Sequence, residues 1–249
     1  MISKSEIKLI KSLKLKKYRI VNKLFLLEGI KSINEVLNSD FIIRKIILNK
    51  SSMNKLKPLS NSKIKIDFFN SKSLSSIGNL KSNSDAIAIV EMKDNFRKIK
   101  YYDYSVVLDG IRDPGNLGTI IRTCDWYGIK NIICSMDSVD LYNPKVIQSS
   151  MGSFSRVNVY FRNLREFFNK NDLFVYGTIL NSKNYHEIKF KKQGILLFGN
   201  ESKGISSNLH KFINKKISIY GNGKAESLNV AISSALILDK VKKNHKIRL

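Results

Sequence analysis

Short apolar segments alternate with segments of helical hydrophobic spacing along nearly the whole chain, and this alternation constrains its fold more than any other feature. Strands that alternate with helices are typical of α/β domains. In the first part of the chain the pattern predicts helices at Ser5–Leu13, Gly29–Leu37 and Leu74–Leu80, and strands at Leu24–Leu27, Phe41–Leu48, Ile64–Phe69 and Ala86–Met92. In the rest it predicts strands at Ser105–Leu108, Asn131–Cys134, Val157–Tyr160, Leu173–Ile179, Ile195–Phe198 and Ile217–Tyr220, and helices at Leu117–Tyr127, Pro144–Ser150 and Ser227–Val241. We therefore expect an α/β fold whose C-terminal part is a mostly parallel sheet flanked by helices.

A basic stretch with little apolar content interrupts the alternation. It contains Lys93, Asp94, Asn95, Arg97, Lys98 and Lys100. Such a change of composition is typical of a segment between domains. We predict a small N-terminal α/β domain at residues 1–92, a linker at 93–103 and a larger α/β domain at 104–249.

The last predicted helix, Ser227–Val241, carries apolar residues at helical spacing. These residues are Leu228, Ala231, Ile232, Ala235, Leu236 and Leu238. We expect them to face the core. Ser227 is a candidate N-cap, because serine is among the preferred residues at that position.

The charge of the chain is extreme. Its 44 Lys and Arg residues face 20 Asp and Glu residues, which leaves a formal net charge of +24. Such a field attracts polyanions, and nucleic acid is the usual partner. Only 9 of the basic residues are Arg, however, and the chain is rich in Ile, Asn and Ser, so drift toward AT-rich codons is an open alternative. An anionic membrane surface has less support, because no long basic amphipathic helix is present in the pattern.

The two cysteines, Cys124 and Cys134, lack the nearby Cys or His companions of a zinc site, and we expect no metal. Cys124 lies in an apolar helical pattern, which predicts a buried, reduced thiol. The basic N-terminus has no apolar stretch suited to a signal peptide. No segment approaches the roughly 20 apolar residues of a membrane span. These features predict a cytoplasmic protein that does not cross a membrane.

Gly-rich polar loops follow three of the predicted strands, at the ends where open α/β sheets bind ligands. In the first loop, Asp109–Gly118, the glycines Gly110 and Gly115 have the spacing of a phosphate-binding Walker A loop. Asn116 and Leu117 stand where that motif needs Lys and Ser/Thr, which disfavours an NTPase. The glycines do not match the dinucleotide-binding pattern either.

Besides Asn116, three polar residues in and around these loops are candidates for a site, and each has a plain structural alternative. Arg122 follows the first loop on a helix and points away from that helix's apolar face, as a solvated surface arginine also would. Glu201, in the second loop at Gly199–Gly204, has the alternative of an ordinary turn carboxylate. Asn229, at the end of the third loop, has the alternative of capping a helix.

Taken together in order, three segments match one family. They read Asp-Pro-Gly-Asn-Leu-Gly-Thr-Ile-Ile-Arg-Thr from Asp113, Phe-Gly-Asn-Glu-Ser-Lys-Gly-Ile from Phe198, and Glu-Ser-Leu-Asn-Val-Ala from Glu226. They resemble the three motifs of the SpoU-type (TrmH-type) RNA ribose 2′-O-methyltransferases. Tyr142–Gly152 also looks like that family, and the resemblance covers about residues 104 to 242. The first hundred residues are similar, by length and element order, to the small α/β RNA substrate-binding domain that many members carry.

The resemblance implies a C-terminal domain with a deep trefoil knot, which the usual rules of chain topology would reject. It also implies a homodimer, with S-adenosylmethionine as co-substrate bound in the knot loops. Gly199, Ile219 and Leu228 occupy the matching positions for contact with S-adenosylmethionine, and Thr178 is a further candidate. Core packing is the alternative role of Ile219 and Leu228.

The implied chemistry needs a ribose hydroxyl to be aligned and relieved of its proton. The counterpart of Arg122 in the family is implicated in this step. An arginine keeps its proton at ordinary pH, so we expect Arg122 to clamp the adjacent phosphate and stabilise the forming alkoxide rather than act as a free base. Asn116 is expected to orient the ribose or Arg122, Glu201 to hold Arg122 or a backbone donor, and Asn229 to complete the polar wall. Ser227 has two equal alternatives, bonding the substrate or capping the helix.

Two other classes of function stay open at this point. One is a non-catalytic RNA-binding protein with a decayed knot domain, and the other is a small-molecule α/β enzyme whose basicity is drift. Ribosomal RNA, and 23S rRNA in particular, is favoured over transfer RNA, because transfer-RNA members more often lack an N-terminal domain; this is analogy at the level of the fold. The three histidines, His186, His210 and His245, lie outside the motifs and are expected at the surface.

Overall fold

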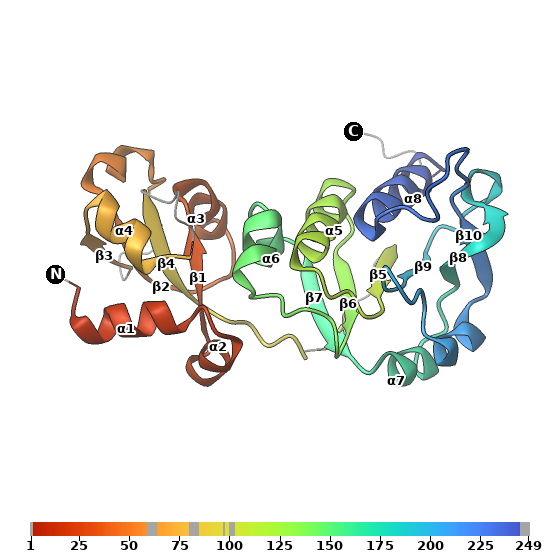
Figure 1. The fold of residues 1–249 in the computed structure, drawn as a ribbon, viewed down its shortest axis with the longest axis horizontal. Helices are drawn as coiled ribbons and strands as arrows, with labels where there is room; N and C mark the ends of the chain where they lie inside the picture. Colours follow the sequence, from red (N-terminus) through yellow and green to blue (C-terminus); the bar gives the residue numbers. More distant parts are fainter. Residues whose placement is uncertain (1, 59–63, 80–84, 97, 100–102, 245–249) are drawn as a thin grey trace. The chain divides into compact units, whose positions relative to one another are not determined.

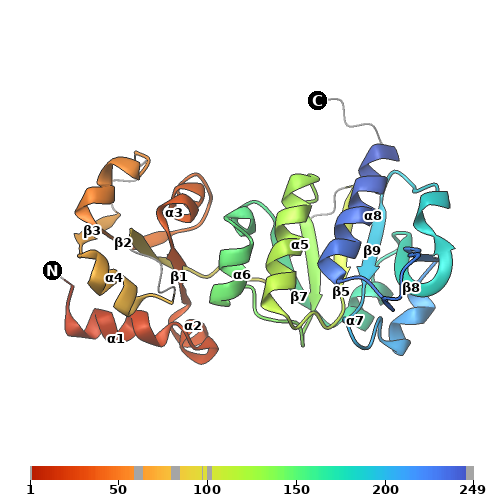
Figure 2. The ribbon, with the colours of Figure 1, turned by 45° about the horizontal axis from the view of Figure 1, so that its top comes forward.

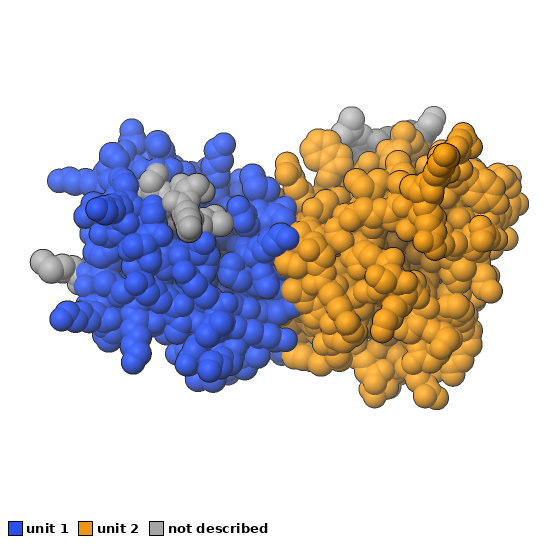
Figure 3. All heavy atoms as spheres, viewed as in Figure 1, with its two compact units in different colours: residues 1–94, 140–155 blue, residues 95–139, 156–249 orange. Residues whose placement is uncertain are grey.

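The computed structural model describes residues 2–58, 64–79, 85–96, 98–99 and 103–244. The chain forms two compact units (Figure 3), one of residues 1–94 with 140–155 and one of residues 95–139 with 156–249. The chain therefore leaves the second unit after Val139, adds 140–155 to the first, and returns at Arg156.

The first unit contains a four-stranded mixed sheet in the order β1-β4-β2-β3 (Figure 1). Its strands are β1 (Leu24–Glu28), β2 (Ile43–Leu48), β3 (Lys65–Phe68) and β4 (Ala86–Glu91). Strand β4 runs antiparallel to β1 and β2, whereas β3 is parallel to β2. The helices from the N-terminal part are α1 (Lys4–Ser12), α2 (Lys16–Asn22), α3 (Ile30–Leu37) and α4 (Ser71–Ile77), with the 3-10 helix η1 (Lys50–Lys55).

Residues 140–155 complete an aromatic core on this first sheet. They contain α6 (Pro144–Ser149) and the 3-10 helix η2 (Ser153–Ser155). The ring of Phe25 in β1 lies 4.7 Å from that of Tyr142 and 5.9 Å from that of Phe154, between centroids. All three side chains are buried. This packing gives a structural reason for the family-like sequence of the Tyr142–Gly152 stretch.

The second unit is built on a six-stranded sheet in the order β10-β8-β9-β5-β6-β7. All its pairings are parallel. Its strands are β5 (Tyr104–Leu108), β6 (Asn131–Ser135), β7 (Asn158–Arg162), β8 (Val175–Asn184), β9 (Gly194–Phe198) and β10 (Lys215–Ser218). Its helices are α5 (Pro114–Trp126), α7 (Leu164–Asn169) and α8 (Val230–Asn244), with the 3-10 helices η3 (Tyr185–Glu187) and η4 (Ser207–Phe212).

Helices cover both faces of the parallel sheet. Val107, Ile133 and Ile195 pack with buried residues of α7 and η4 on one face. Because side chains alternate along a strand, Val106, Leu108 and Ile132 face the other side, where α5 lies. Helices α5 and α8 lie side by side in both ribbon views (Figures 1 and 2). The expected parallel α/β architecture is confirmed.

The structure corrects several details of the predicted elements. Helices α2 and α7 were not predicted; α7 lies in a basic segment whose Leu164 and Phe167 are nevertheless buried. The predicted helix Leu74–Leu80 begins at Ser71 and ends at Ile77, and Leu80 lies outside the described residues. Every predicted strand is present, with ends that shift by a few residues.

The last helix differs most from its prediction. It begins at Val230, so Ser227 is not its N-cap. The cap is Asn229, whose Oδ1 accepts the N–H of Ala231 at 2.8 Å. The predicted apolar stripe is also partly wrong, because Leu228, Ile232 and Leu236 are 49%, 52% and 37% exposed. The side of α8 that faces the core is instead formed by Val230, Ala231, Ser234, Ile237, Leu238 and Val241.

Both cysteines are fully buried and free, as predicted for Cys124. Burial raises the pKa of the Cys124 and Cys134 thiols far above the ordinary value. A buried thiol with a raised pKa is a poor nucleophile, so these side chains serve packing.

Candidate active site

The loops after β5 and β9 meet, because these two strands are neighbours in the parallel sheet. Asp109, directly after β5, accepts the backbone N–H of Ser206 on Oδ2 at 2.7 Å. In the opposite direction, Asn200 Nδ2 donates to the carbonyl oxygen of Gly110 at 2.8 Å. The first and second motif loops are thus fixed to each other at the carboxyl edge of the sheet.

The end of a third strand, β6, supports the turn at Gly110. Ser135, at the end of β6, accepts the N–H of Gly110 on Oγ at 2.8 Å and donates to Asp137 Oδ1 at 2.7 Å. The hydrogen bond from Ser135, followed by that from Arg112, lowers the pKa of Asp137. Gly110 has a φ of +70°, a conformation that favours glycine. Both polar groups of the Gly110 peptide therefore have side-chain partners.

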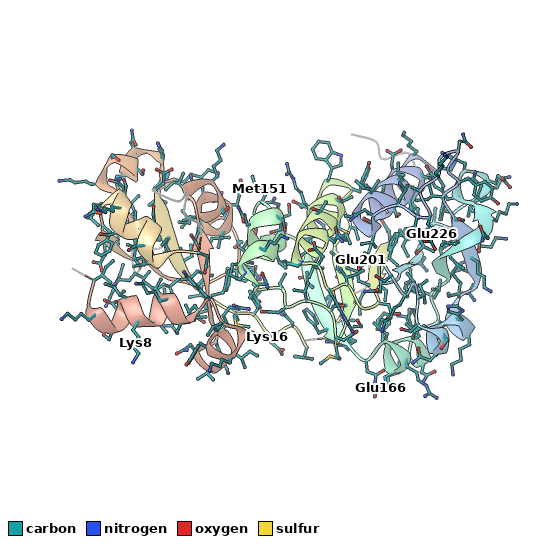
Figure 4. The ribbon with its side chains drawn as sticks, viewed as in Figure 1. Lys8, Lys16, Met151, Glu166, Glu201 and Glu226 are labelled. Atoms are coloured by element: carbon teal, nitrogen blue, oxygen red, sulfur yellow. The ribbon has the colours of Figure 1, made fainter. Side chains whose placement is uncertain are left out.

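Three of the predicted site residues form one chain of hydrogen bonds. Asn116 Nδ2 donates to Glu201 Oε1 at 2.6 Å, and Asn229 Nδ2 donates to Asn116 Oδ1 at 2.9 Å. The direction of the chain is fixed at both ends, since the N–H of Ala231 can only donate to Asn229 and the Glu201 carboxylate can only accept. Figure 4 labels Glu201 in the loop after β9. Each of the three motifs contributes one residue.

Two helices begin at this chain of hydrogen bonds and run in the same direction. Asn116 is in the first turn of α5 and Asn229 caps α8, while near the other ends Tyr127 hydroxyl donates to Asp239 Oδ1 at 3.3 Å. The N-termini of α5, with 13 residues, and α8, with 15, therefore lie together. Aligned peptide dipoles make such helix ends favourable for anionic groups. The site is suited to a phosphate or a carboxylate.

Arg122 lies on the exposed side of α5. The apolar face predicted for this helix is confirmed, because Ile120, Ile121 and Cys124 are fully buried. Among the described residues, Arg122 has no hydrogen-bond or ion-pair partner. Glu201 was expected to hold Arg122 or a backbone donor; in this structure its carboxylate accepts the side-chain amide of Asn116. The guanidinium is left available for a ligand.

The four residues predicted to touch the co-substrate lie on or just after the adjacent strands β10, β8 and β9, or directly before α8. Thr178 Oγ1 donates to the carbonyl of Leu197 at 3.2 Å. Ile219 is half-buried, and Leu228 is 49% exposed, so core packing does not account for Leu228. Gly199 is very tightly surrounded: a Cβ there would lie 2.2 Å from the backbone carbon of Gly204.

Three contributing residues were not singled out from the sequence. Asp109 and Asn200 lie inside the recognised loops, so their position next to Gly110 and Glu201 was a usable signal. Ser135 lies outside the motifs, and only the pairing of β6 with β5 brings it to Gly110. Ser227 is exposed beside Leu228 and makes no hydrogen bond among the described residues.

The remaining candidates do not join the site. His186 and His210 are exposed, as predicted, and His245 lies outside the described residues. No cluster of His, Cys, Asp or Glu side chains suited to a metal ion is found within the described part of the chain. Of the helices described, none has both the length and the apolar character needed to traverse a bilayer.

Comparisons with known proteins identify similar sequences and folds. Residues 4–88 match the MRM3-like substrate binding domain. The 23S rRNA (guanosine(2553)-2′-O)-methyltransferase RlmP of Bacillus subtilis is 28% identical over 232 residues, which are 92% of this chain and 92% of that protein. An AdoMet-bound rRNA methyltransferase from Sinorhizobium meliloti is 26% identical with a TM-score of 0.87, covering 100% of this chain and 98% of that one. A TrmH-family protein from Porphyromonas gingivalis is 27% identical with a TM-score of 0.88, covering 98% and 99%.

The match to the SpoU rRNA Methylase family spans residues 103–239, more than half of the chain, and includes all three motif loops. The chain therefore belongs to the SpoU rRNA methylase family, as the resemblance of its motifs predicted.

Proposed function

We propose that this chain transfers a methyl group from S-adenosylmethionine to a ribose 2′-hydroxyl of RNA. The observation that carries the proposal is the hydrogen-bonded chain Glu201–Asn116–Asn229, which joins the three family motifs at one edge of the parallel sheet. A decayed, non-catalytic domain has no need for this directed network. The small-molecule alternative is disfavoured because the N-terminal residues match a substrate-binding domain of RNA-modifying relatives.

The co-substrate fits the loops around Gly199 and Leu228. Gly199 is half-buried and leaves no room for a side chain, whereas Gly221 is exposed and no atom lies within 4 Å of a Cβ added there, so backbone is accessible in the loop after β10. S-adenosylmethionine supplies a methyl group on a sulfonium, which is already an activated leaving group. The residues of the chain therefore have to position the ribose oxygen and remove its proton.

Asn116 helps to position the ribose oxygen, and Arg122 assists removal of its proton. The free guanidinium of Arg122 is suited to a bidentate clamp on the phosphate next to the target ribose, and to stabilising the alkoxide as it forms. The oxygen–methyl bond forms as the sulfur–methyl bond breaks, and the clamped phosphate accepts the hydroxyl proton. Glu201 acts as a positioning residue through Asn116, and Ser227 Oγ is free to bond the substrate.

Variants of Asn116 and Glu201 should each lower activity, and the two losses should not add up in the double variant. Asn116→Ala and Glu201→Ala should each lower kcat by about 10- to 100-fold, because the first removes the Asn116 amide and the second removes the carboxylate that orients it. The double variant should be no slower than the worse single variant, since the two residues act as one unit. A methyl-transfer assay on the four proteins tests this, and strictly multiplicative losses would mean that the hydrogen bond is incidental.

Ribosomal RNA, and 23S rRNA in particular, is the proposed substrate. A relative that covers nearly all of the chain carries that activity in its name. The domain boundaries proposed are 1–92 for RNA substrate binding, 93–103 for the linker and 104–249 for the knotted methyltransferase domain. The trefoil knot and a cytoplasmic location belong to the same proposal, and transfer RNA is the alternative substrate.

A homodimer is proposed from exposed apolar residues on α5, on α8 and directly before α8. Leu228, Ile232 and Leu236 repeat every four residues, and Trp126 is 84% exposed on α5. Exposed apolar residues that gather in one patch mark an interface, and we propose that these four belong to one. A second copy covering it would also approach Arg122, one turn before Trp126, so the complete site would need both chains.

Ile232→Glu should convert the dimer to monomers, because a buried unpaired charge opposes association. Methyl transfer should fall in parallel. Met53→Glu is the matched control, since Met53 is 44% exposed on η1 in the other unit. Sedimentation or light scattering gives the mass; a monomeric wild-type protein at micromolar concentration would rule the dimer out.

The function is tested by mapping ribose methylations in cellular RNA with and without this protein, and by tritium transfer from S-adenosylmethionine to RNA. Loss of a single 23S rRNA mark is the expected result. Loss of one transfer-RNA mark alone would mean that transfer RNA, rather than 23S rRNA, is the substrate. Absence of any transfer to RNA would refute the reaction.

A further inference from the structure

The segment from Lys14 to Lys23, which comprises α2 and the turn before it, is almost entirely exposed. Within these residues only Arg19 is buried, at 2% exposure. The segment holds four lysines and no acidic residue. It also exposes large apolar side chains: Leu15, Tyr18, Ile20 and Val21. A surface that combines lysines with exposed aromatic and aliphatic groups differs from one on which lysines have merely accumulated.

Helix α1 continues the same positive surface. Lys4, Lys8 and Lys11 repeat at intervals of four and three residues, so they share one face of the helix, while Ile10 is buried. Figure 4 labels Lys8 on α1 and Lys16 on α2. None of these lysines has an ion-pair partner among the described residues.

The acidic residue nearest in the sequence does not neutralise this surface. Glu6 accepts Lys45 Nζ at 2.6 Å, and this hydrogen bond is the main reason that its pKa falls to about 2. No Asp or Glu occurs from Ile7 to Leu27. The positive potential of α1 and α2 is therefore uncompensated within this segment.

A buried arginine fixes the shape of the segment. Arg19 Nη1 donates to the carbonyls of Leu13 at 2.9 Å and Lys14 at 2.8 Å, and Nη2 binds Asp140 Oδ2 at 2.6 Å. Asp140 Oδ1 in turn accepts the N–H of Tyr142, which belongs to the aromatic core. The turn between α1 and α2 is thus tied to the interior, and the lysines extend from a fixed backbone.

We propose that this surface is a docking platform for the phosphate backbone of the RNA substrate. The basic platform is defined as Lys8, Lys11, Lys14, Lys16, Lys17, Tyr18 and Lys23. Its lysines contact phosphates, and Tyr18 lies against a base or ribose, as aromatic side chains do on RNA. The identity of the ligand rests on the proposed function. An anionic membrane is the weaker occupant, because α2 has only 7 residues and mixes charged with apolar positions.

The test compares two triple variants of the full chain. Lys14→Glu/Lys16→Glu/Lys17→Glu reverses three platform charges, and Lys31→Glu/Lys50→Glu/Lys72→Glu makes the same change at exposed lysines of α3, η1 and α4 in the same unit. Filter binding to a 23S rRNA transcript gives Kd at several salt concentrations. The platform variant should bind about 10- to 100-fold more weakly, and its log–log salt slope should be smaller by about 2 to 3. The control triple should change Kd by about threefold or less.

Kinetics and a conservative pair separate docking from damage to the fold. The platform triple should raise KM for RNA with little change in kcat or in KM for S-adenosylmethionine. Tyr18→Ala should weaken RNA binding by about 5- to 100-fold, the range of one lost stacking contact, while Tyr18→Phe should restore it. Far-UV circular dichroism and Tm should match the wild type in all variants, because every changed side chain is exposed.

Several results would contradict the proposed platform. Equal losses of RNA affinity in both triple variants would mean that bulk charge alone binds RNA. An unchanged salt slope in the platform variant would mean that its lysines do not contact phosphates. Loss of binding to phosphatidylserine vesicles with unchanged RNA binding would assign the surface to a membrane. If the wild-type protein methylates RNA and the platform triple variant binds RNA normally, the platform is rejected while the proposed reaction is retained. If the wild-type protein transfers no methyl group while the two triple variants still differ in RNA binding, the proposed reaction is rejected and the platform is retained.

Discussion

Replacing Arg122 by lysine is expected to lower the rate of methyl transfer by about 100- to 1,000-fold, the usual effect of removing one donor to a developing oxyanion. Arg122 is exposed and has no partner among the described residues, so its loss should leave the fold intact. A guanidinium offers two parallel N–H groups to phosphate oxygens, whereas an ammonium acts as a point charge. Lysine keeps the charge and loses the fork, which isolates the bidentate role.

The matched control for this change is Arg165→Lys. Arg165 is likewise exposed, but it lies on α7, on the opposite face of the sheet. Its substitution should leave kcat within about twofold, as for surface changes away from a site. Binding of S-adenosylmethionine, measured by calorimetry, should stay near the wild-type value in both variants. A near-normal rate for Arg122→Lys would exclude the bidentate clamp, and Arg122→Ala would then report on charge alone.

The sequence was sufficient to predict the elements that carry the site. Short apolar runs located every strand, because strands buried on both faces are nearly continuous in apolar residues. The family motifs then identified Asn116, Glu201 and Asn229, which the structure joins by hydrogen bonds. Spacing along the chain does not specify which side chain pairs with which, and the pairing of Glu201 with Asn116 rather than Arg122 required coordinates.

The failures have two physical causes. An apolar residue at helical spacing indicates a helix but not whether its partner belongs to the same chain. Leu228, Ile232 and Leu236 were therefore predicted to face the core, although they are exposed and form the surface proposed here for a second copy. Conversely, α7 was missed because basic residues around it obscured the apolar pair Phe167 and Phe168, which lie buried against the sheet.

The sequence also gave no sign that residues 140–155 belong with the N-terminal unit. This assignment depends on long-range packing, in which Tyr142 and Phe154 complete a cluster around Phe25. The same segment supplies Asp140, which holds Arg19 and thereby the basic platform. A stretch that resembles a methyltransferase family therefore stabilises the unit whose sequence matches a substrate-binding domain.

Gly199→Ala is expected to abolish detectable methyl transfer and to weaken binding of S-adenosylmethionine by about 100-fold, because a displacement of about 1 Å in a binding loop has effects of that size. A Cβ at Gly199 would lie 2.2 Å from the carbon of Gly204 and 2.3 Å from the nitrogen of Ile205. Both are backbone atoms, which cannot rotate away as a flexible side chain would. The loop after β9 must therefore shift, and Glu201 moves with it.

Stability measurements distinguish this local effect from general unfolding. Gly199→Ala should lower the free energy of unfolding by about 1–3 kcal/mol, as overpacking does. Gly128→Ala is the control: Gly128 has a φ of +68° and nothing within 4 Å of an added Cβ, and it precedes β6, away from the carboxyl edge. Its left-handed conformation should cost about 1–2 kcal/mol, yet activity at 25 °C should be retained. If Gly199→Ala binds S-adenosylmethionine as the wild type does, the loop after β9 is not part of the co-substrate site, whatever its effect on stability.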